Sequence, residues 1–244
     1  MKTGDMVLQS EFVASWANGK RLAFIGDGDA ISVCVAYLKE RGIIDYGPSK
    51  IVVFDFDGRI CGAVARFADK ERLEQLQATQ YNCIDPFPDP GHFDCFYTNP
   101  PWGASNEGTS VRVFVRRGME AVGYTGEGIV VIADDDDLDW TKQVLANTQK
   151  FALESGFFVN RLMPSLHQYH LDDAPHLRSC NLLLKPMTGN RVPGPSVAVD
   201  PSEITRFYGR TSSLRVRYVV EKLRLDYGKA HEDEYELELV EGNE

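Results

Sequence analysis

The 244-residue sequence lacks several features that mark common classes of protein. No apolar run approaches the ~20 residues that a membrane span needs, and the first residues contain no apolar stretch of a secretory signal. The five cysteines form no C-x-x-C pair, so we expect buried, reduced thiols, with neither a disulfide framework nor a bound metal. These absences predict a cytoplasmic location and no membrane partner.

Basic residues are scarce as well. The sequence has 26 lysines and arginines against 36 aspartates and glutamates, which gives a net charge of −10. This charge disfavours general affinity for DNA or RNA, because their phosphates repel it. A negative net charge suits a small cationic amine as the partner, although it is also explained by the need to keep the protein soluble. The oligomeric state stays open, with a homodimer as one candidate.

Strand-like apolar runs alternate with helical spacing along most of the chain. These runs end in polar residues and lie at 21–25, 51–54, 81–84, 93–97 and 129–132. The alternation predicts an α/β fold of the doubly wound, Rossmann type, with a mostly parallel sheet and helices on both faces. Because right-handed crossovers bring the carboxyl ends of parallel strands to one edge, the polar residues should gather there.

The composition divides the chain into a lead-in over 1–20, a Rossmann-type catalytic domain over 21–186 and an extension over 187–244. Within the extension, 214–225 alternates arginine with apolar residues and predicts an edge strand or hairpin. The acidic tail, 231–244, is expected to be frayed.

The first predicted strand ends in Gly26-Asp27-Gly28-Asp29. Two glycines allow the backbone to approach a nucleotide closely, so we assign Gly26 and Gly28 to the binding of a nucleoside cofactor. Carboxylates at a helix N-terminus suit the uptake of a proton or hydrogen bonds from a ribose. A full dinucleotide fingerprint has a third glycine where Ile31 stands, so a plain tight turn also explains the pattern.

Two further acids follow predicted strands. Asp57 stands where Rossmann sites place an acid that binds ribose hydroxyls, and Asp55 is its neighbouring competitor. Asp85 follows the third predicted strand and is placed to meet the amino group of an adenine. A polar helix start and an Asp-Pro turn are the simpler explanations for these two positions.

The most specific pattern is Asn99-Pro100-Pro101-Trp102, directly after an apolar strand. It resembles the [DN]-P-P-[YFW] motif of enzymes that transfer groups from S-adenosylmethionine to amino nitrogens. An asparagine oxygen and a carbonyl held by prolines can both accept hydrogen bonds from one nitrogen and so orient its lone pair. Trp102 can stack on a flat substrate or hold a cation over its ring.

An asparagine cannot take up a proton, whereas an alkyl amine, with a pKa of about 10, must lose one before it attacks. Asp27 and Asp29 are the nearest carboxylates at the same edge. We predict that Asp27 is the base, because it directly follows the strand-ending Gly26, and that Asp29 turns inward to cap the helix.

Together, the first turn, Asp57 and the Asn-Pro-Pro-Trp motif resemble the branched-chain polyamine synthases, over about residues 20–185. The resemblance implies transfer of an aminopropyl group from decarboxylated S-adenosylmethionine to a polyamine, with Asp27 or Asp29 activating the amine. The family carries Gly-Asp-Asp-Asp and Asp-Pro-Pro-Tyr, so Gly28, Asn99 and Trp102 depart from it and leave the acceptor open. Its N-terminal winged-helix region is expected to be absent.

Two other functions fit the same residues. The Asn-Pro-Pro-Trp motif suits an S-adenosylmethionine-dependent methyltransferase that acts on adenine in nucleic acid or on a protein amide, and the arginine-rich segment 206–224 favours it. Altered motifs would also permit a Rossmann domain without catalysis. Four aspartates at 134–137 can attract a polycation or cap a helix, and three histidines lie in a predicted loop over 166–177 without a zinc spacing: His167, His170 and His176.

Overall fold

The computed structural model describes all residues except 105–106, 171–173, 175, 190–192, 205–206, 208–213, 223–233 and 241–244. Arg206, Arg210 and Arg224 of the arginine-rich segment and residues 231–233 and 241–244 of the acidic tail therefore lie outside the described residues. No helix in the described part of the chain is long and apolar enough to cross a membrane.

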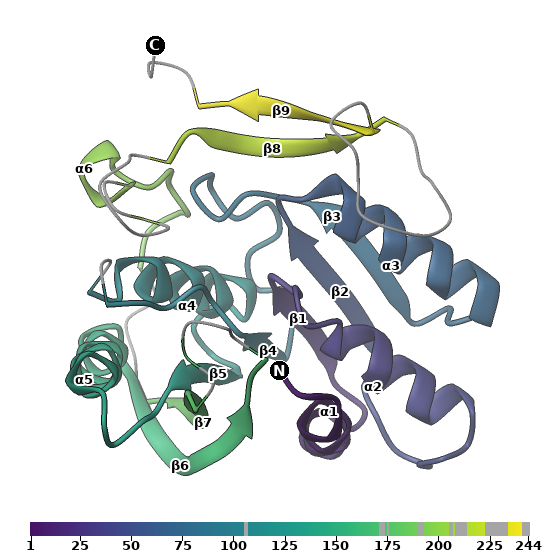
Figure 1. Ribbon diagram of the computed structural model, residues 1–244, viewed down its shortest axis with the longest axis horizontal. Helices are drawn as coiled ribbons and strands as arrows, with labels where there is room; N and C mark the ends of the chain where they lie inside the picture. Colours follow the sequence, from purple (N-terminus) through teal and green to yellow (C-terminus); the bar gives the residue numbers. More distant parts are fainter. Residues whose placement is uncertain are drawn as a thin grey trace.

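A seven-stranded sheet with the order β3-β2-β1-β4-β5-β7-β6 forms the centre of the molecule (Figure 1). The first five strands along the chain are parallel, and β7 is antiparallel to both of its neighbours, β5 and β6. The strands are β1 (Arg21–Ile25), β2 (Lys50–Asp55), β3 (Leu76–Gln80), β4 (Cys95–Thr98), β5 (Glu127–Ala133), β6 (Phe157–Gln168) and β7 (Arg178–Pro186). The predicted doubly wound, mostly parallel sheet is confirmed.

Successive side chains of a buried strand pack alternately into two hydrophobic cores, one on each face of the sheet. Leu22 and Phe24 of β1 belong to a core with α1 (Thr3–Trp16), α2 (Ile31–Glu40) and α3 (Gly58–Glu71). Ala23 and Ile25 belong to the opposite core, with α4 (Thr109–Ala121) and α5 (Asp139–Glu154). Neighbouring side chains of a strand point to opposite faces, so both faces of β1 are covered by helices.

Several predicted elements differ in the structure. The apolar run 81–84 is not the third strand. It is buried, but it lies beyond the end of β3, which is the polar stretch before it. Polar residues form this strand because an edge strand exposes much of its surface. The lead-in is the helix α1, which contacts α2. Residues 166–168, predicted as loop, complete β6.

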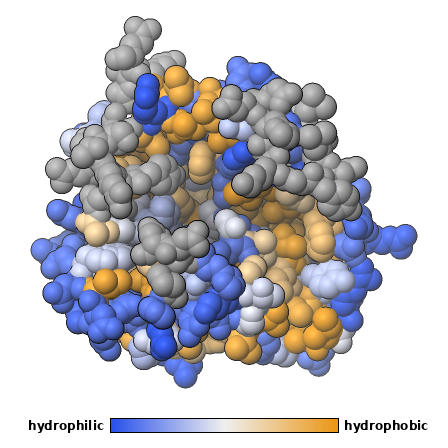
Figure 2. Space-filling model, viewed as in Figure 1, coloured by the Kyte–Doolittle hydropathy of each residue, from blue (hydrophilic) through white to orange (hydrophobic). Residues whose placement is uncertain are grey.

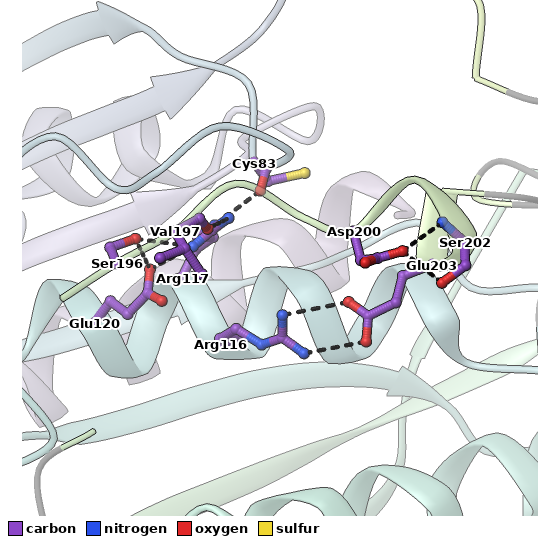
Figure 3. A network of polar contacts seen from close by, with 9 residues as sticks. All are labelled: Cys83, Arg116, Arg117, Glu120, Ser196, Val197, Asp200, Ser202 and Glu203. Atoms are coloured by element: carbon purple, nitrogen blue, oxygen red, sulfur yellow. Dashed lines mark hydrogen bonds and ion pairs between the residues drawn. The ribbon is translucent and has the colours of Figure 1, made fainter. Parts of the chain in front are cut away.

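The C-terminal extension packs on the Rossmann unit at two places. A hairpin of β8 (Val216–Glu221) and β9 (Tyr235–Leu239) lies beside α3 (Figure 1), so the hairpin predicted over 214–225 exists but takes its second strand from the acidic tail. At the second place Arg116 of α4 pairs with Glu203 of α6 (Pro201–Ile204). The neighbouring Arg117, which is buried, donates to Cys83, Ser196 and Val197 and pairs with Glu120 (Figure 3).

Figure 2 shows hydrophilic residues at the lower left of one face and apolar residues over its lower right.

Candidate active site

A cavity of about 540 Å³ opens where β1, β2 and β4 end. Of the predicted site residues, those that line it are Gly26, Gly28, Asp29, Asp57, Asn99, Pro100, Pro101 and Trp102. Parallel strands end at one edge of the sheet, and the turns that follow them therefore build one pocket. The cavity also meets Asp55, Asn82, Cys83 and Tyr169, of which only Asp55 was considered from the sequence.

The first turn depends on Gly26. Its φ is +74°, and a Cβ there would lie 3.1 Å from the ring of Phe114 in α4. Both the left-handed backbone and the close ring favour glycine at this position. Gly28 has open space where a Cβ would stand, so only the first glycine is required by the fold of the turn.

Asp27 does not line the cavity. Its carboxylate turns inward and caps α2: it accepts from the Ile31 nitrogen at 2.9 Å and from the nitrogen and hydroxyl of Ser32. Burial raises the pKa of Asp27 to about 8, while the hydrogen bonds from Ser32 and Ile31 oppose the shift. The structure thus places Asp27, and not Asp29 as predicted, at the N-terminus of α2, because the residue after the strand is the one that reaches the helix, and it leaves Asp29 at the cavity.

Asp29 lines the cavity and contacts the asparagine of the second motif. Its Oδ2 accepts from Asn99 Nδ2 at 2.5 Å, and its Oδ1 lies 3.1 Å from the ammonium group of Met1. The side chain is 23% exposed. This carboxylate thus already pairs with an ammonium group while remaining open to the cavity.

The Asn-Pro-Pro-Trp motif follows β4 and forms the opposite wall. Trp102 Nε1 donates to Asn99 Oδ1 at 3.3 Å, and the Ser110 hydroxyl of α4 donates to the Pro101 carbonyl. The ring of Trp102 meets that of Tyr169 edge to face, with centroids 5.5 Å apart, and that of Trp140 at 6.4 Å. The motif therefore presents a carboxamide beside an aromatic cluster.

Two acids at the end of β2 line the cavity on the other side. Asp55 accepts from the backbone nitrogens of Asp27 at 3.2 Å and Asp57 at 2.9 Å. Burial raises the pKa of Asp55, and these two hydrogen bonds oppose the rise. Asp57 caps α3 and forms an ion pair with Arg59 at 2.6 Å. Both acids are in reach of a ligand, but Asp57 is already neutralised by an arginine.

Asp85 is not brought to the cavity. Its two carboxylate oxygens are held by β8: Arg217 Nη2 donates to one and the Tyr218 hydroxyl to the other, each at 2.8 Å. Both oxygens of the Asp85 carboxylate, which we predicted to lie near an adenine, therefore already accept hydrogen bonds from the hairpin. Asn82 lines the cavity in its place and donates to the Arg217 carbonyl at 2.5 Å.

Comparison with known proteins assigns the family. The sequence model of the branched-chain polyamine synthase A C-terminal domain matches residues 6–238. The chain belongs to this family. The resemblance inferred from the two motifs is confirmed. No curated protein matches the chain.

Solved structures share the fold. The branched-chain polyamine synthase of Thermus thermophilus, in complex with N4-aminopropylspermidine and 5'-methylthioadenosine, is 21% identical, with a TM-score of 0.62. The C9 mutein of the same enzyme is 22% identical, with a TM-score of 0.64. Each of the two alignments includes 80% of this chain but only 59% of the Thermus thermophilus protein. A geranyl diphosphate methyltransferase in complex with S-adenosylmethionine is 10% identical over 74% of this chain and 85% of its own, with a TM-score of 0.53.

The remaining predicted features of the chain lie away from the cavity. The aspartates of 134–137 line a separate hollow of about 390 Å³ with Lys2 and Arg178. His167 is buried and forms hydrogen bonds with Ser179 and Gln9, whereas His170 and His176 are exposed. In the described residues no group of His, Cys, Asp or Glu could hold a metal ion.

Proposed function

We propose that this chain transfers an aminopropyl group from decarboxylated S-adenosylmethionine to an amine nitrogen of a polyamine. The charge of the cavity carries the proposal. Among the described residues that line it are the carboxylates Asp29, Asp55 and Asp57 and no lysine, arginine or histidine. Arg59 pairs with Asp57 and the Met1 ammonium group with Asp29, so two cations offset part of the charge of three carboxylates and the excess is negative. S-adenosylmethionine has a carboxylate that such a lining would repel, whereas its decarboxylated form ends in an ammonium group that the lining attracts.

The two walls of the cavity bind different substrates. The adenosine of the donor lies between the first turn and the β2 acids, with Asp55 or Asp57 accepting from the ribose hydroxyls. The acceptor amine lies between Asp29 and Asn99, beside the ring of Trp102, which attracts a cation through its face. The methylthioadenosine and aminopropylated polyamine bound by the relative from Thermus thermophilus support this division.

Asp29 removes the proton that the acceptor amine must lose. The freed lone pair attacks the aminopropyl carbon next to the sulfonium sulfur, and the carbon–sulfur bond breaks with its electron pair going to sulfur. The products are the alkylated amine and methylthioadenosine. Asn99 Oδ1 and the Pro100 carbonyl orient the attacking nitrogen, which raises the rate by fixing the geometry of attack.

Ligand-dependent melting distinguishes this function from the two alternatives. A ligand at 100 times its Kd stabilises the folded state by about 2.7 kcal/mol. Decarboxylated S-adenosylmethionine and methylthioadenosine should both raise the melting temperature, and mass spectrometry should detect addition of aminopropyl groups to spermidine. A rise with S-adenosylmethionine alone would favour a methyltransferase, and no rise with any of the three would favour a binding module.

A further inference from the structure

The turn after β3 forms part of the cavity wall. Asn82 and Cys83 line the cavity, and because β3 pairs with β2, this turn lies on the side of the two acids after β2. Within the turn, the Asp85 nitrogen donates to the Asn82 carbonyl at 3.0 Å and the Ile84 nitrogen to Asn82 Oδ1 at 3.1 Å. The Tyr81 hydroxyl donates to the Asp85 carbonyl at 2.9 Å. These bonds join residues of one short segment, so contacts from other elements fix where it lies.

Different elements hold the middle and the ends of the turn. In the middle, the Cys83 carbonyl accepts from Arg117 Nε of α4 and the Ile84 carbonyl from the Val199 nitrogen, each at 2.8 Å. The two ends, Asn82 and Asp85, contact β8 instead. The position of the ends therefore depends on the hairpin.

Arg217 of β8 contacts both ends at once. Its carbonyl accepts from Asn82 Nδ2 at 2.5 Å, and its Nη2 donates to Asp85 Oδ1 at 2.8 Å. The Tyr218 hydroxyl donates to Asp85 Oδ2, also at 2.8 Å. Successive side chains of a regular strand point to opposite faces, but the register of β8 and β9 shifts between Val216 and Tyr218. Such a bulge redirects a side chain and lets both residues reach one carboxylate.

The strand β8 is itself anchored to the Rossmann unit. The Val219 carbonyl accepts from Gln80 Nε2 at 3.0 Å, and Glu221 pairs with Arg66 of α3 through two hydrogen bonds, at 2.8 and 3.0 Å. A Cβ on Gly58, at the start of α3, would lie 2.8 Å from the Val219 carbonyl. Glycine thus permits the close approach of β8, which gives the turn a fixed support.

We propose that Arg217 and Tyr218 are positioning residues for the donor, which hold the turn 82–85 where Asn82 and Cys83 meet the nucleoside. Neither of the two side chains belongs to the described lining of the cavity, so they act through Asn82 and Asp85. The inference rests on the proposed function, because it concerns the donor half of the same cavity. It gives Asp85 an indirect part in donor binding, in place of the direct contact with adenine predicted from the sequence.

The exposure of these contacts separates positioning from general stability. The side chain of Arg217 is 40% exposed and that of Asp85 22%. An ion pair that is this open to water contributes little to the free energy of unfolding. Its loss should therefore leave the protein folded and move the turn, and the effect should appear in donor affinity.

Binding and kinetics test the role. Tyr218→Phe and Arg217→Ala should each weaken binding of methylthioadenosine about threefold to tenfold, the scale of one lost hydrogen bond. The donor KM should rise accordingly, with kcat at saturating substrates within about twofold of the wild type. Arg217→Lys, which keeps a donor toward Asp85, should recover most of the affinity. In an Asp85→Ala background, Tyr218→Phe should have no further effect.

Arg66→Ala is the matched control. It removes the ion pair that attaches the same hairpin to α3, and neither Arg66 nor Glu221 lines the described cavity. Affinity for methylthioadenosine should stay as in the wild type. An equal loss in Arg66→Ala would show that β8 acts only by stabilising the fold, and normal affinity in both Tyr218→Phe and Arg217→Ala would also overturn the proposal.

A measurement without ligand separates this inference from the proposed function. The amides of Ile84 and Asp85 are bonded within the turn, so their hydrogen exchange reports its local opening. Exchange at both should be about threefold faster or more in Tyr218→Phe and Arg217→Ala, and unchanged in Arg66→Ala. Unchanged exchange in the first two variants would overturn the inference, whether or not aminopropyl transfer is observed. A wild type that binds no methylthioadenosine would refute the proposed function, and the inference with it.

Discussion

Asp29 and Asn99 lie 70 positions apart in the sequence, and their side chains meet in a hydrogen bond of 2.5 Å. The bond joins the turn after β1 to the motif after β4, two strands that are neighbours in the sheet. It places an acceptor-only carboxylate next to a carboxamide, at the point where a base and an orienting oxygen are needed together. Strand order, rather than sequence distance, thus creates the candidate site.

The first prediction concerns which aspartate is the base. Asp29→Asn should lower turnover about 10²–10⁴-fold, the usual effect of removing a general base. Asp27→Asn should change it little, because Asp27 caps α2 outside the cavity and an asparagine can still accept from Ile31 and Ser32. Turnover with spermidine across pH 7 to 10 measures both variants.

Wild-type turnover should rise over this range as the acceptor amine, with a pKa of about 10, loses its proton. A large loss in Asp27→Asn with normal turnover in Asp29→Asn would restore the assignment made from the sequence. Near-normal rates in both variants would exclude carboxylate catalysis at the first turn.

The second prediction compares the two acids after β2. Asp55 has no ion-pair partner among the described residues, whereas Asp57 is paired with Arg59 at 2.6 Å. We therefore expect Asp55→Asn to weaken binding of methylthioadenosine more than Asp57→Asn, by about tenfold for a lost hydrogen bond to a charged group. Calorimetry gives both affinities, and turnover at saturating donor should fall much less than affinity. A larger loss in Asp57→Asn would identify that residue as the ribose acceptor instead.

Sequence reasoning found the fold and the pocket, and its errors have identifiable causes. The strands were predictable because both faces of β1 and β2 are buried and leave near-continuous apolar runs. The direction in which Asp27 and Asp29 point depends on how α2 begins, and that is set by backbone angles such as the left-handed Ala30. The capture of Asp85 by β8 is a contact across 132 positions that no local pattern encodes.

Tyr169 could not be found from the sequence for a related reason. It follows β6, the last strand of the sheet order, and no motif surrounds it. It reaches the cavity only because β7 lies between β5 and β6 and presents Ser179 to its hydroxyl.

The third prediction concerns the buried arginine that anchors the extension. Arg117 is fully buried, and its ion pair with Glu120 measures 2.7 Å. Arg117→Ala should lower the free energy of unfolding by about 3–5 kcal/mol, because Glu120 keeps a buried charge without a partner. Arg116→Ala breaks a partly exposed pair with Glu203 and should cost less than about 1 kcal/mol. Urea unfolding compares the two, and equal losses would contradict the role given to burial.

The last prediction uses the pH dependence of stability. Burial raises the pKa of Asp27 from its ordinary value of 3.8 to about 8. Below pH 3.8 Asp27 is protonated in the folded and in the unfolded protein, so its stabilising contribution to the free energy of unfolding is fully present there. Between the two values the unfolded chain loses the proton and the folded protein keeps it, so stability falls as pH rises, by at most about 1.4 kcal/mol per unit.

His167 acts in the opposite sense, since burial lowers its pKa from 6.5 to about 4 and stability is lost as pH falls through that interval. Above pH 6.5 this contribution of His167 is constant, and the difference between the wild type and Asp27→Asn isolates Asp27 between pH 6.5 and 8. Over this window the free energy of unfolding of the wild type should fall relative to Asp27→Asn, which has no proton to keep. Asp139→Asn, which changes an exposed aspartate at the start of α5, is the control and should run parallel to the wild type. If Asp27→Asn ran parallel as well, the hydrogen bonds from Ile31 and Ser32 would outweigh burial, and Asp27 would be ionised in the folded protein.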